Sequence, residues 1–178
     1  MKLRAILAAL TLLVVAAPAT ASLAQVSPAP AQGFPTRDGP LSGMLMILPE
    51  EQEAEFDKPY DQPPIVTPLK TVRIGQSVVL KLVFIGPQPD ADGMIDLTYD
   101  LKIIRPNGRV SEGGGLNGLP ALRIMAEHPE AVFDNRGAII KVTYEPGDPE
   151  GTWRYEATLH DNVSGRTLKL VAEVQLVP

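Results

Sequence analysis

Six residues whose side chains can bind a cation or transfer a proton lie in or next to three loop segments of the C-terminal half. They are Asp90, Asp92, His128, His160, Asp161 and Asn162. Carboxylate and imidazole groups suit a hard or borderline divalent cation, so a metal or another small ligand is the first chemistry to consider. A solvated acidic surface would carry the same residue types, because charged side chains are mostly exposed. Whether these residues form a ligand site or a solvated surface depends on which strands position the three loops.

The sequence lacks the motifs that would assign an enzymatic reaction. It contains no cysteine, which excludes thiol catalysis, thiolate zinc sites and iron–sulfur clusters. No serine lies in a G-x-S-x-G motif, and the glycine-rich GGGLNG at 113–118 lacks the Lys and Thr that complete a P-loop. PDADG at 89–93 begins like a calcium-binding loop, but Tyr99 occupies the position of the required Glu. We therefore expect a protein that is not an enzyme and has no cofactor.

The N-terminal segment 1–24 matches a secretory signal peptide. Lys2 and Arg4 precede an apolar run, and the small residues up to Ala21 and Ala24 offer two cleavage sites. The apolar run is shorter than the roughly 20 residues that a transmembrane helix needs. We therefore expect cleavage after Ala21 or Ala24, and a periplasmic or secreted bacterial protein without an integral membrane anchor.

The charge of the mature chain argues against nucleic-acid partners. Cleavage after Ala24 removes two of the 16 basic residues and none of the 21 acidic ones, which changes the formal net charge from -5 to -7. A protein of this charge is repelled by phosphate groups and by anionic membrane surfaces. Without disulfides its stability must come from burial, and roughly 150 residues suffice for one domain with a core.

The segment between the signal peptide and the main domain divides into two parts. Residues 25–40 are rich in Pro, Gly and Ala, so we expect a disordered leader. Residues 41–65 form an N-terminal extension, in which Pro49 and the acidic residues after it favour a short helix at 49–58. The apolar run LSGMLMIL at 41–48 has the length of a strand. It either joins the chain's own sheet as an edge strand, which we favour, or is donated to a partner's sheet.

From residue 66 onward, apolar residues recur at every second position in segments separated by turns. This period is typical of strands that pack on one side. We expect strands at 71–74, 77–85, 94–104 and 138–145, followed by a hairpin at 151–175. Trp153 and Tyr155 fall on the apolar face of the hairpin, and His160 falls on its outward face next to the turn. Residues 109–136 show no regular period.

The residues DPEGTWRYEATLHDNVSGRTLKL at 148–170 resemble the last two strands of bacterial immunoglobulin-like modules. The shared pattern is an Asp, a Gly, an aromatic residue, alternating apolar residues, a second Asp, a Ser-Gly turn and a final alternating strand. Short strands at a spacing of roughly 8–12 residues also favour a β-sandwich. The predicted fold class is therefore all-β: an immunoglobulin-like antiparallel β-sandwich over 66–178, with an extended Pro-rich N-terminal leader and room for one short helix.

An immunoglobulin-like strand order places loops 86–93, 127–137 and 161–166 at the same end of the sandwich. The six candidate residues would then converge, and both histidines of the protein would lie among them. This convergence supports an alternative function, a periplasmic protein that binds a metal or small ligand. The whole chain also resembles small exported proteobacterial proteins. Our first prediction is a non-enzymatic exported module that binds a protein or cell-envelope partner.

Overall fold

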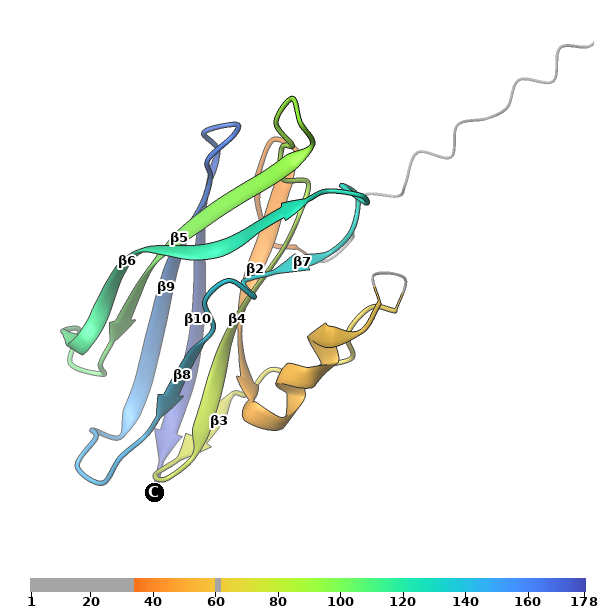
Figure 1. The fold of residues 1–178 in the computed structure, drawn as a ribbon. Coiled ribbons are helices and arrows are strands. Elements are labelled where there is room, and N and C mark those ends of the chain that lie inside the picture. The colour runs from red at the N-terminus through yellow and green to blue at the C-terminus, as the bar shows by residue number, and fades with distance from the viewer. Residues whose placement is uncertain (1–33, 60–61) are drawn as a thin grey trace, which may run out of the picture.

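Two β-sheets pack face to face in the computed structural model, which describes residues 34–59 and 62–178 (Figure 1). The expected signal peptide and the first part of the leader lie outside the described residues. The strands of the first sheet, here called sheet A, are β1 (Thr36–Asp38), β2 (Leu41–Pro49), β4 (Ser77–Ile85), β7 (Phe133–Asp134) and β8 (Ile140–Thr143). In sheet A, β4 lies between β2 on one side and β7 and β8 on the other.

The second sheet, sheet B, carries the C-terminal hairpin. Its strands, in spatial order, are β3 (Thr71–Arg73), β10 (Thr167–Val177), β9 (Gly151–Asp161), β5 (Met94–Ile104) and β6 (Val110–Met125). β3 pairs parallel with β10, and the other pairs of both sheets are antiparallel. β2, β4 and β8 thus take the places of strands A, B and E of an immunoglobulin fold, and β5, β9 and β10 those of strands C, F and G, with β6 added beside β5. The predicted immunoglobulin-like sandwich is confirmed.

The main core lies between the two sheets. Alternate residues of β5 and β9 point into it, which confirms the period of two read from the sequence. Trp153 and Tyr155 are both buried there, as predicted. The indole of Trp153 contacts the ring of Tyr144 edge to face at 5.4 Å and donates a hydrogen bond to the Pro149 carbonyl at 3.0 Å. These aromatic residues therefore belong to the scaffold.

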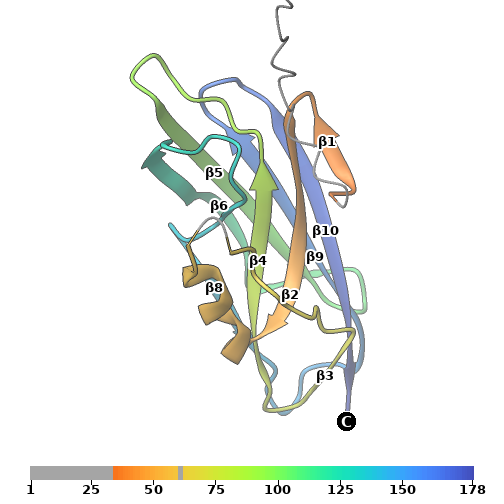
Figure 2. The same cartoon turned by 90° about the vertical axis from the view of Figure 1, so that its right-hand side faces the viewer.

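A second, smaller apolar cluster covers the outer face of sheet A. β2 and β4 are apolar on both faces, as strands covered on both sides are. Their outward side chains include Met46 and Val79, and Phe56 packs on them from the short helix η1 (Glu50–Asp57). Figure 2 shows η1 lying outside β2 and β4, on the side of sheet A away from sheet B. The burial of Phe56 in this cluster positions η1 on the outer face of sheet A.

The N-terminal region differs from the prediction in its boundaries. β2 pairs with β4 from Ser42 to Pro49, so the apolar run at 41–48 joins the chain's own sheet, as we favoured, although β1 and not β2 forms the edge. Within the expected disordered leader, Thr36–Asp38 forms β1 and pairs with β2. The helix expected at 49–58 is present as a 3-10 helix. Backbone pairing with β2 orders the end of the leader although its composition offers little to bury.

The region at 109–136, which has no sequence period, begins as the long strand β6. Its pairing with β5 is interrupted by three register shifts, which remove the alternation. At one irregularity Gly114 is closely approached, because an added Cβ atom would meet the Ser111 side chain and lie 3.0 Å from the Ile103 Cβ atom. After β6 the chain crosses from sheet B to sheet A and pairs with β4 as β7. This crossing decides where the loop 127–137 lies.

Candidate functional site

Asp161 connects the hairpin tip to the loop before β5. Its side chain is buried, with 1% of the residue exposed. Oδ2 accepts hydrogen bonds from the Gln88 backbone N–H at 2.9 Å and the Ser164 hydroxyl at 2.6 Å, and Oδ1 accepts from the Val163 and Ser164 N–H groups. Asp161 thus caps its own turn and fixes the loop 86–93 beside it. Both carboxylate oxygens are therefore used in hydrogen bonds that stabilise the fold.

The neighbours of Asp161 face outward from sheet B. His160 Nε2 lies 3.1 Å from Asp100 Oδ2, on the outward face that the sequence predicted. The backbone N–H of Gly118, followed by His160, lowers the pKa of Asp100. Asn162 donates to Asp96 Oδ1 at 3.0 Å and accepts from the Thr98 hydroxyl at 3.2 Å. His160 and Asn162 therefore form separate polar pairs.

Asp90 has the role expected of a turn residue. Its Oδ1 accepts hydrogen bonds from the N–H groups of Asp92 and Met94, at 2.9 and 2.8 Å. Such side-chain to backbone bonds are the usual function of Asp in a turn. Asp92 is exposed on the same turn. This pair closes the loop between β4 and β5.

His128 follows β6, in the segment that lines the groove beside η1. The segment before it starts beside the loop 86–93, because Ala126 N–H donates to the Gly93 carbonyl. The chain then crosses toward sheet A, and His128 Nδ1 lies 3.4 Å from Glu130 Oε1. In residues 34–59 and 62–178, no three His, Asp or Glu side chains gather as a metal-binding group. The six candidate residues therefore include no metal-binding group of this kind in the described part of the chain.

An apolar groove opens where the crossing segment faces η1. Its volume is about 260 Å³. The apolar side chains of its walls include Phe56, Pro63, Ile124, Met125, Val132 and Phe133, and His128 also lines it. Three of these are large apolar residues that remain exposed: Met125 at 53%, Val132 at 44% and Ile124 at 36%. Exposed apolar side chains grouped around a hollow mark an interaction site more often than scattered ones do.

A buried ion pair joins Lys81 to Asp134, and Asp134 lines the groove. Lys81, on the outward face of β4, is 2% exposed, and its Nζ lies 3.2 Å from Asp134 Oδ1. The other oxygen, Oδ2, accepts a hydrogen bond from Arg136 Nη2 at 2.8 Å. Arg136 Nη2 also donates to the Phe56 carbonyl at 3.1 Å, and Lys81 Nζ lies 4.7 Å from the centre of the Phe56 ring. These three charges attach η1 to sheet A.

Asn135 joins the two short strands next to the groove. Its side chain is buried between β7 and β8, where it accepts from Leu82 N–H at 3.0 Å and donates to the Ala138 and Leu80 carbonyls. These bonds continue the pairing along β4 where no strand residue is available. β7 is therefore held against β4 although it is only two residues long.

Sequence reasoning missed this groove and its ion pair. The available signal was Lys81, which interrupts the apolar run SVVLKLVFI of β4. A lysine among apolar residues on both sides either points to solvent or is buried with an acidic partner. Nothing in the sequence named Asp134 as that partner, because the pairing depends on the crossing after β6.

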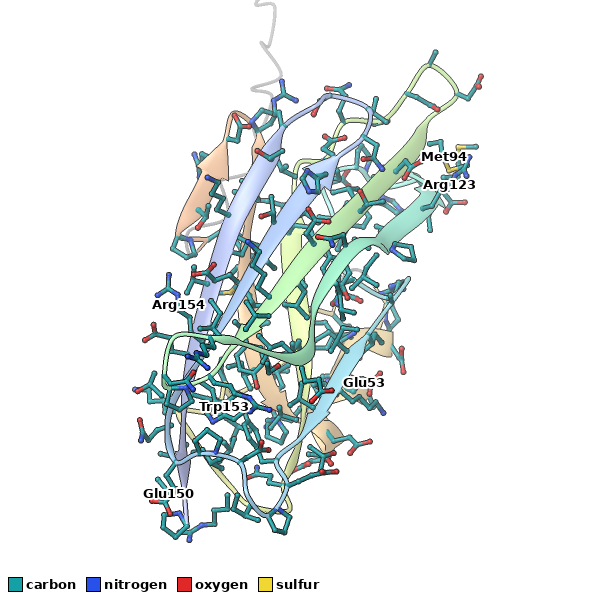
Figure 3. The ribbon with its side chains drawn as sticks, turned by 90° about the vertical axis from the view of Figure 1, so that its left-hand side faces the viewer. Glu53, Met94, Arg123, Glu150, Trp153 and Arg154 are labelled. Atoms are coloured by element: carbon teal, nitrogen blue, oxygen red, sulfur yellow. The ribbon has the colours of Figure 1, made fainter. Side chains whose placement is uncertain are left out.

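A second, more polar hollow of about 280 Å³ lies at the other end of the sandwich. It is bordered by Arg105 and Trp153, whose guanidinium and indole ring are 5.9 Å apart. Behind them the hydroxyls of Tyr144 and Tyr155 are hydrogen-bonded to each other, and burial raises the pKa of Tyr144 to about 12 and that of Tyr155 further. Figure 3 shows Trp153 and Glu150 toward this end and Met94 and Arg123 at the opposite one.

Comparisons with known proteins assign the chain to no family. No protein-family model and no curated protein sequence matches the chain. Among solved structures, a DNA-bound alkylpurine DNA glycosylase of Pseudomonas fluorescens is 13% identical with a TM-score of 0.44, and a family 123 glycoside hydrolase of Clostridium perfringens is 11% identical with a TM-score of 0.45. The matches cover 78% and 77% of this chain but only 31% and 27% of those proteins.

A CARDB domain of Pyrococcus furiosus, solved in complex with di-metal ions, is similar over a larger share of its own length. It is 11% identical with a TM-score of 0.38, and the match covers 77% of this chain and 89% of that domain. Similarities this distant assign neither an activity nor a ligand to this chain. In the described part of the chain, no helix is long and apolar enough to cross a membrane.

Proposed function

We propose that this chain is an exported, non-enzymatic module that binds a polypeptide partner of the cell envelope in the groove beside η1. The observation that carries the proposal is the gathering of Ile124, Met125 and Val132, all exposed, around one apolar hollow. Each leaves apolar surface in water, and burying such surface contributes roughly 25 cal/mol per Å². A partner that covers the groove would recover this free energy.

The size of the groove supports a large partner that inserts a small part of itself. Its volume of about 260 Å³ is below the roughly 300–1,000 Å³ of pockets that hold a drug-sized molecule. Protein interfaces, in contrast, depend on a few apolar or aromatic side chains that enter pockets of the other protein. We infer that the groove takes one anchor side chain of a polypeptide.

The chemistry of the groove supports binding without catalysis. The carboxylate of Asp134 is occupied by Lys81 and Arg136, and the described residues that line the groove include no Ser or Thr to act as a nucleophile. Export is supported by the charged, apolar and small-residue segments of 1–24. Intact mass of the mature protein will check cleavage after Ala21 or Ala24.

A capture experiment with paired variants tests the proposed function. The mature protein, Val132→Asp and Val171→Asp are immobilised and exposed to envelope extract of the source cells. Val132 lines the groove, whereas Val171 is equally exposed, at 46%, on β10 of sheet B. We expect Val132→Asp to reduce recovery of a specific polypeptide about tenfold and Val171→Asp to leave it unchanged. Equal recovery on all three proteins would contradict the proposal, and melting curves check that both variants fold.

A further inference from the structure

The charges below the groove do not balance. Lys81 and Arg136 are two cations, and Asp134 is the one carboxylate within 4 Å of either among the described residues. Asp134 uses Oδ1 for Lys81 and Oδ2 for Arg136, so both of its oxygens are occupied. One of the two positive charges therefore has no carboxylate of its own among the described residues. Buried charges are favourable only when they are paired.

The unbalanced charge is accessible at Arg136. Lys81 is buried and also lies against the Phe56 ring, which compensates part of its charge. The Arg136 side chain is 56% exposed and lines the groove. Both of its hydrogen bonds to the described chain come from Nη2. A guanidinium has five N–H donors, so those on Nε and Nη1 remain for an acceptor from outside.

The orientation of Arg136 is fixed before any ligand arrives. Its bonds to Asp134 and to the Phe56 carbonyl hold the guanidinium at the edge of the apolar walls. Less side-chain entropy is lost when a guanidinium that is already held in place binds a carboxylate. Glu55 is paired with Lys58, and among the described residues that line the groove the only other carboxylate besides Asp134 is Glu127. An incoming anion is therefore favoured beside Arg136 and disfavoured beside Glu127.

We propose that the partner segment carries a carboxylate next to its apolar anchor side chain, and that this carboxylate pairs with Arg136. The inference rests on the proposed function, because it assumes that the groove receives an apolar side chain of a polypeptide. It adds the chemistry of the recognised segment: an apolar C-terminal residue with its free carboxylate, or an apolar residue beside an acidic one. The contacts of the anchor side chain with the apolar walls supply affinity, and the ion pair with Arg136 makes binding specific for segments that carry a carboxylate.

Two small probes test this proposal on the intact mature protein. N-acetyl-phenylalanine has an aromatic side chain and a carboxylate, and N-acetyl-phenylalanine amide replaces the carboxylate by a neutral group. With methionine methyl groups labelled with ¹³C, the Met125 signal reports the groove. We expect the acid to shift this signal with a dissociation constant in the millimolar range and the amide to bind about fivefold more weakly.

Three arginine variants separate the charge from the fold. Arg136→Gln should reduce binding of the acid to the level of the amide, and Arg136→Lys should restore part of the difference because it keeps the charge. Arg123→Gln is the matched control, since Arg123 is an exposed residue of β6 that does not line the groove. We expect it to leave both affinities unchanged, and melting curves check that each variant folds.

The outcomes distinguish the two proposals. Equal binding of acid and amide, with no effect of Arg136→Gln, would overturn the carboxylate recognition and leave the groove as an apolar site. No shift of the Met125 signal with either probe at tens of millimolar would overturn the groove as a binding site and with it the proposed function. Selective binding of the acid that depends on Arg136 supports both.

Discussion

The buried carboxylate of Asp161 connects the last hairpin to the loop before β5. It accepts four hydrogen bonds, one of them from Gln88 of that loop. An aspartate at the end of a strand could be recognised in the sequence as a turn residue. Its long-range bond could not, because Gln88 is 73 residues away.

Replacing Asp161 tests this structural role. Asp161→Ala leaves the N–H groups of Gln88, Val163 and Ser164 without an acceptor near the core, so we expect the free energy of unfolding to fall by roughly 2–4 kcal/mol. Asn162→Ala changes an exposed neighbour and should cost less than about 1 kcal/mol. Urea denaturation measures both. A larger loss for Asn162→Ala would contradict the role assigned to Asp161.

The ion pair under η1 predicts unequal effects for its two ends. Asp134→Ala leaves the buried Lys81 without a carboxylate, so we expect a loss of roughly 3–5 kcal/mol. Lys81→Met should cost much less, about 1 kcal/mol, because Asp134 keeps Arg136 and the methionine fills the space. Denaturant unfolding of both variants measures the two losses of unfolding free energy. A larger loss of unfolding free energy for Lys81→Met than for Asp134→Ala would contradict the claim that Lys81 needs the carboxylate of Asp134.

The buried tyrosines predict instability in alkali. Burial raises the pKa values of Tyr144 and Tyr155 above their ordinary value of about 10, so the fold favours their neutral forms. Their contribution to stability is complete below about pH 10 and is lost as the pH rises through about 12, where Tyr144 ionises in the fold. Tyr155→Phe should therefore show a smaller decrease of melting temperature between pH 9 and 12. Equal slopes for both proteins would contradict this.

Strands in which apolar and polar residues alternate could be predicted from the sequence. Strands that form only through pairing with a neighbouring strand could not. β5, β9 and β10 each place one apolar face on the core, which leaves a period of two in the sequence. β6 carries bulges and glycines, so its pattern follows no period although its pairing with β5 is extensive. β7 is set by the crossing to sheet A and by Asn135, which only the folded chain brings together.

Phe56 is the apolar anchor of the short helix η1, to which Arg136 and Lys141 add polar contacts. Phe56 is its only buried residue, and no side chain caps its N-terminus. We expect Phe56→Ala to release η1 from sheet A while the sandwich stays folded, because the core between the sheets is untouched. Endoproteinase Glu-C should then cleave after Glu51, Glu53 or Glu55 faster than in the wild type. Val163→Ala, at the exposed hairpin tip, serves as the control, and an unchanged cleavage rate in Phe56→Ala would contradict the anchoring role.

The molecule as a whole has an immunoglobulin-like sandwich as its scaffold and one groove added on the outside of sheet A. The sandwich could be read from the sequence because its strands follow local patterns. The groove could not, because it forms where η1 and the segment after β6 meet over β4. Of the six candidate residues proposed from the sequence, three lie at the hairpin tip and two in the loop between β4 and β5, and only His128 lines the groove.

Photocrosslinking in living cells tests the central claim most directly. p-Benzoylphenylalanine is placed at Met125 in the groove and, in a second protein, at Val171 on sheet B, two positions of similar exposure. If the groove binds the partner, irradiation gives a defined adduct with one polypeptide at Met125, none at Val171, and a loss of the adduct when Val132→Asp is added. No adduct at Met125, or the same adduct from both positions, would contradict the claim that the groove is where this protein meets its partner.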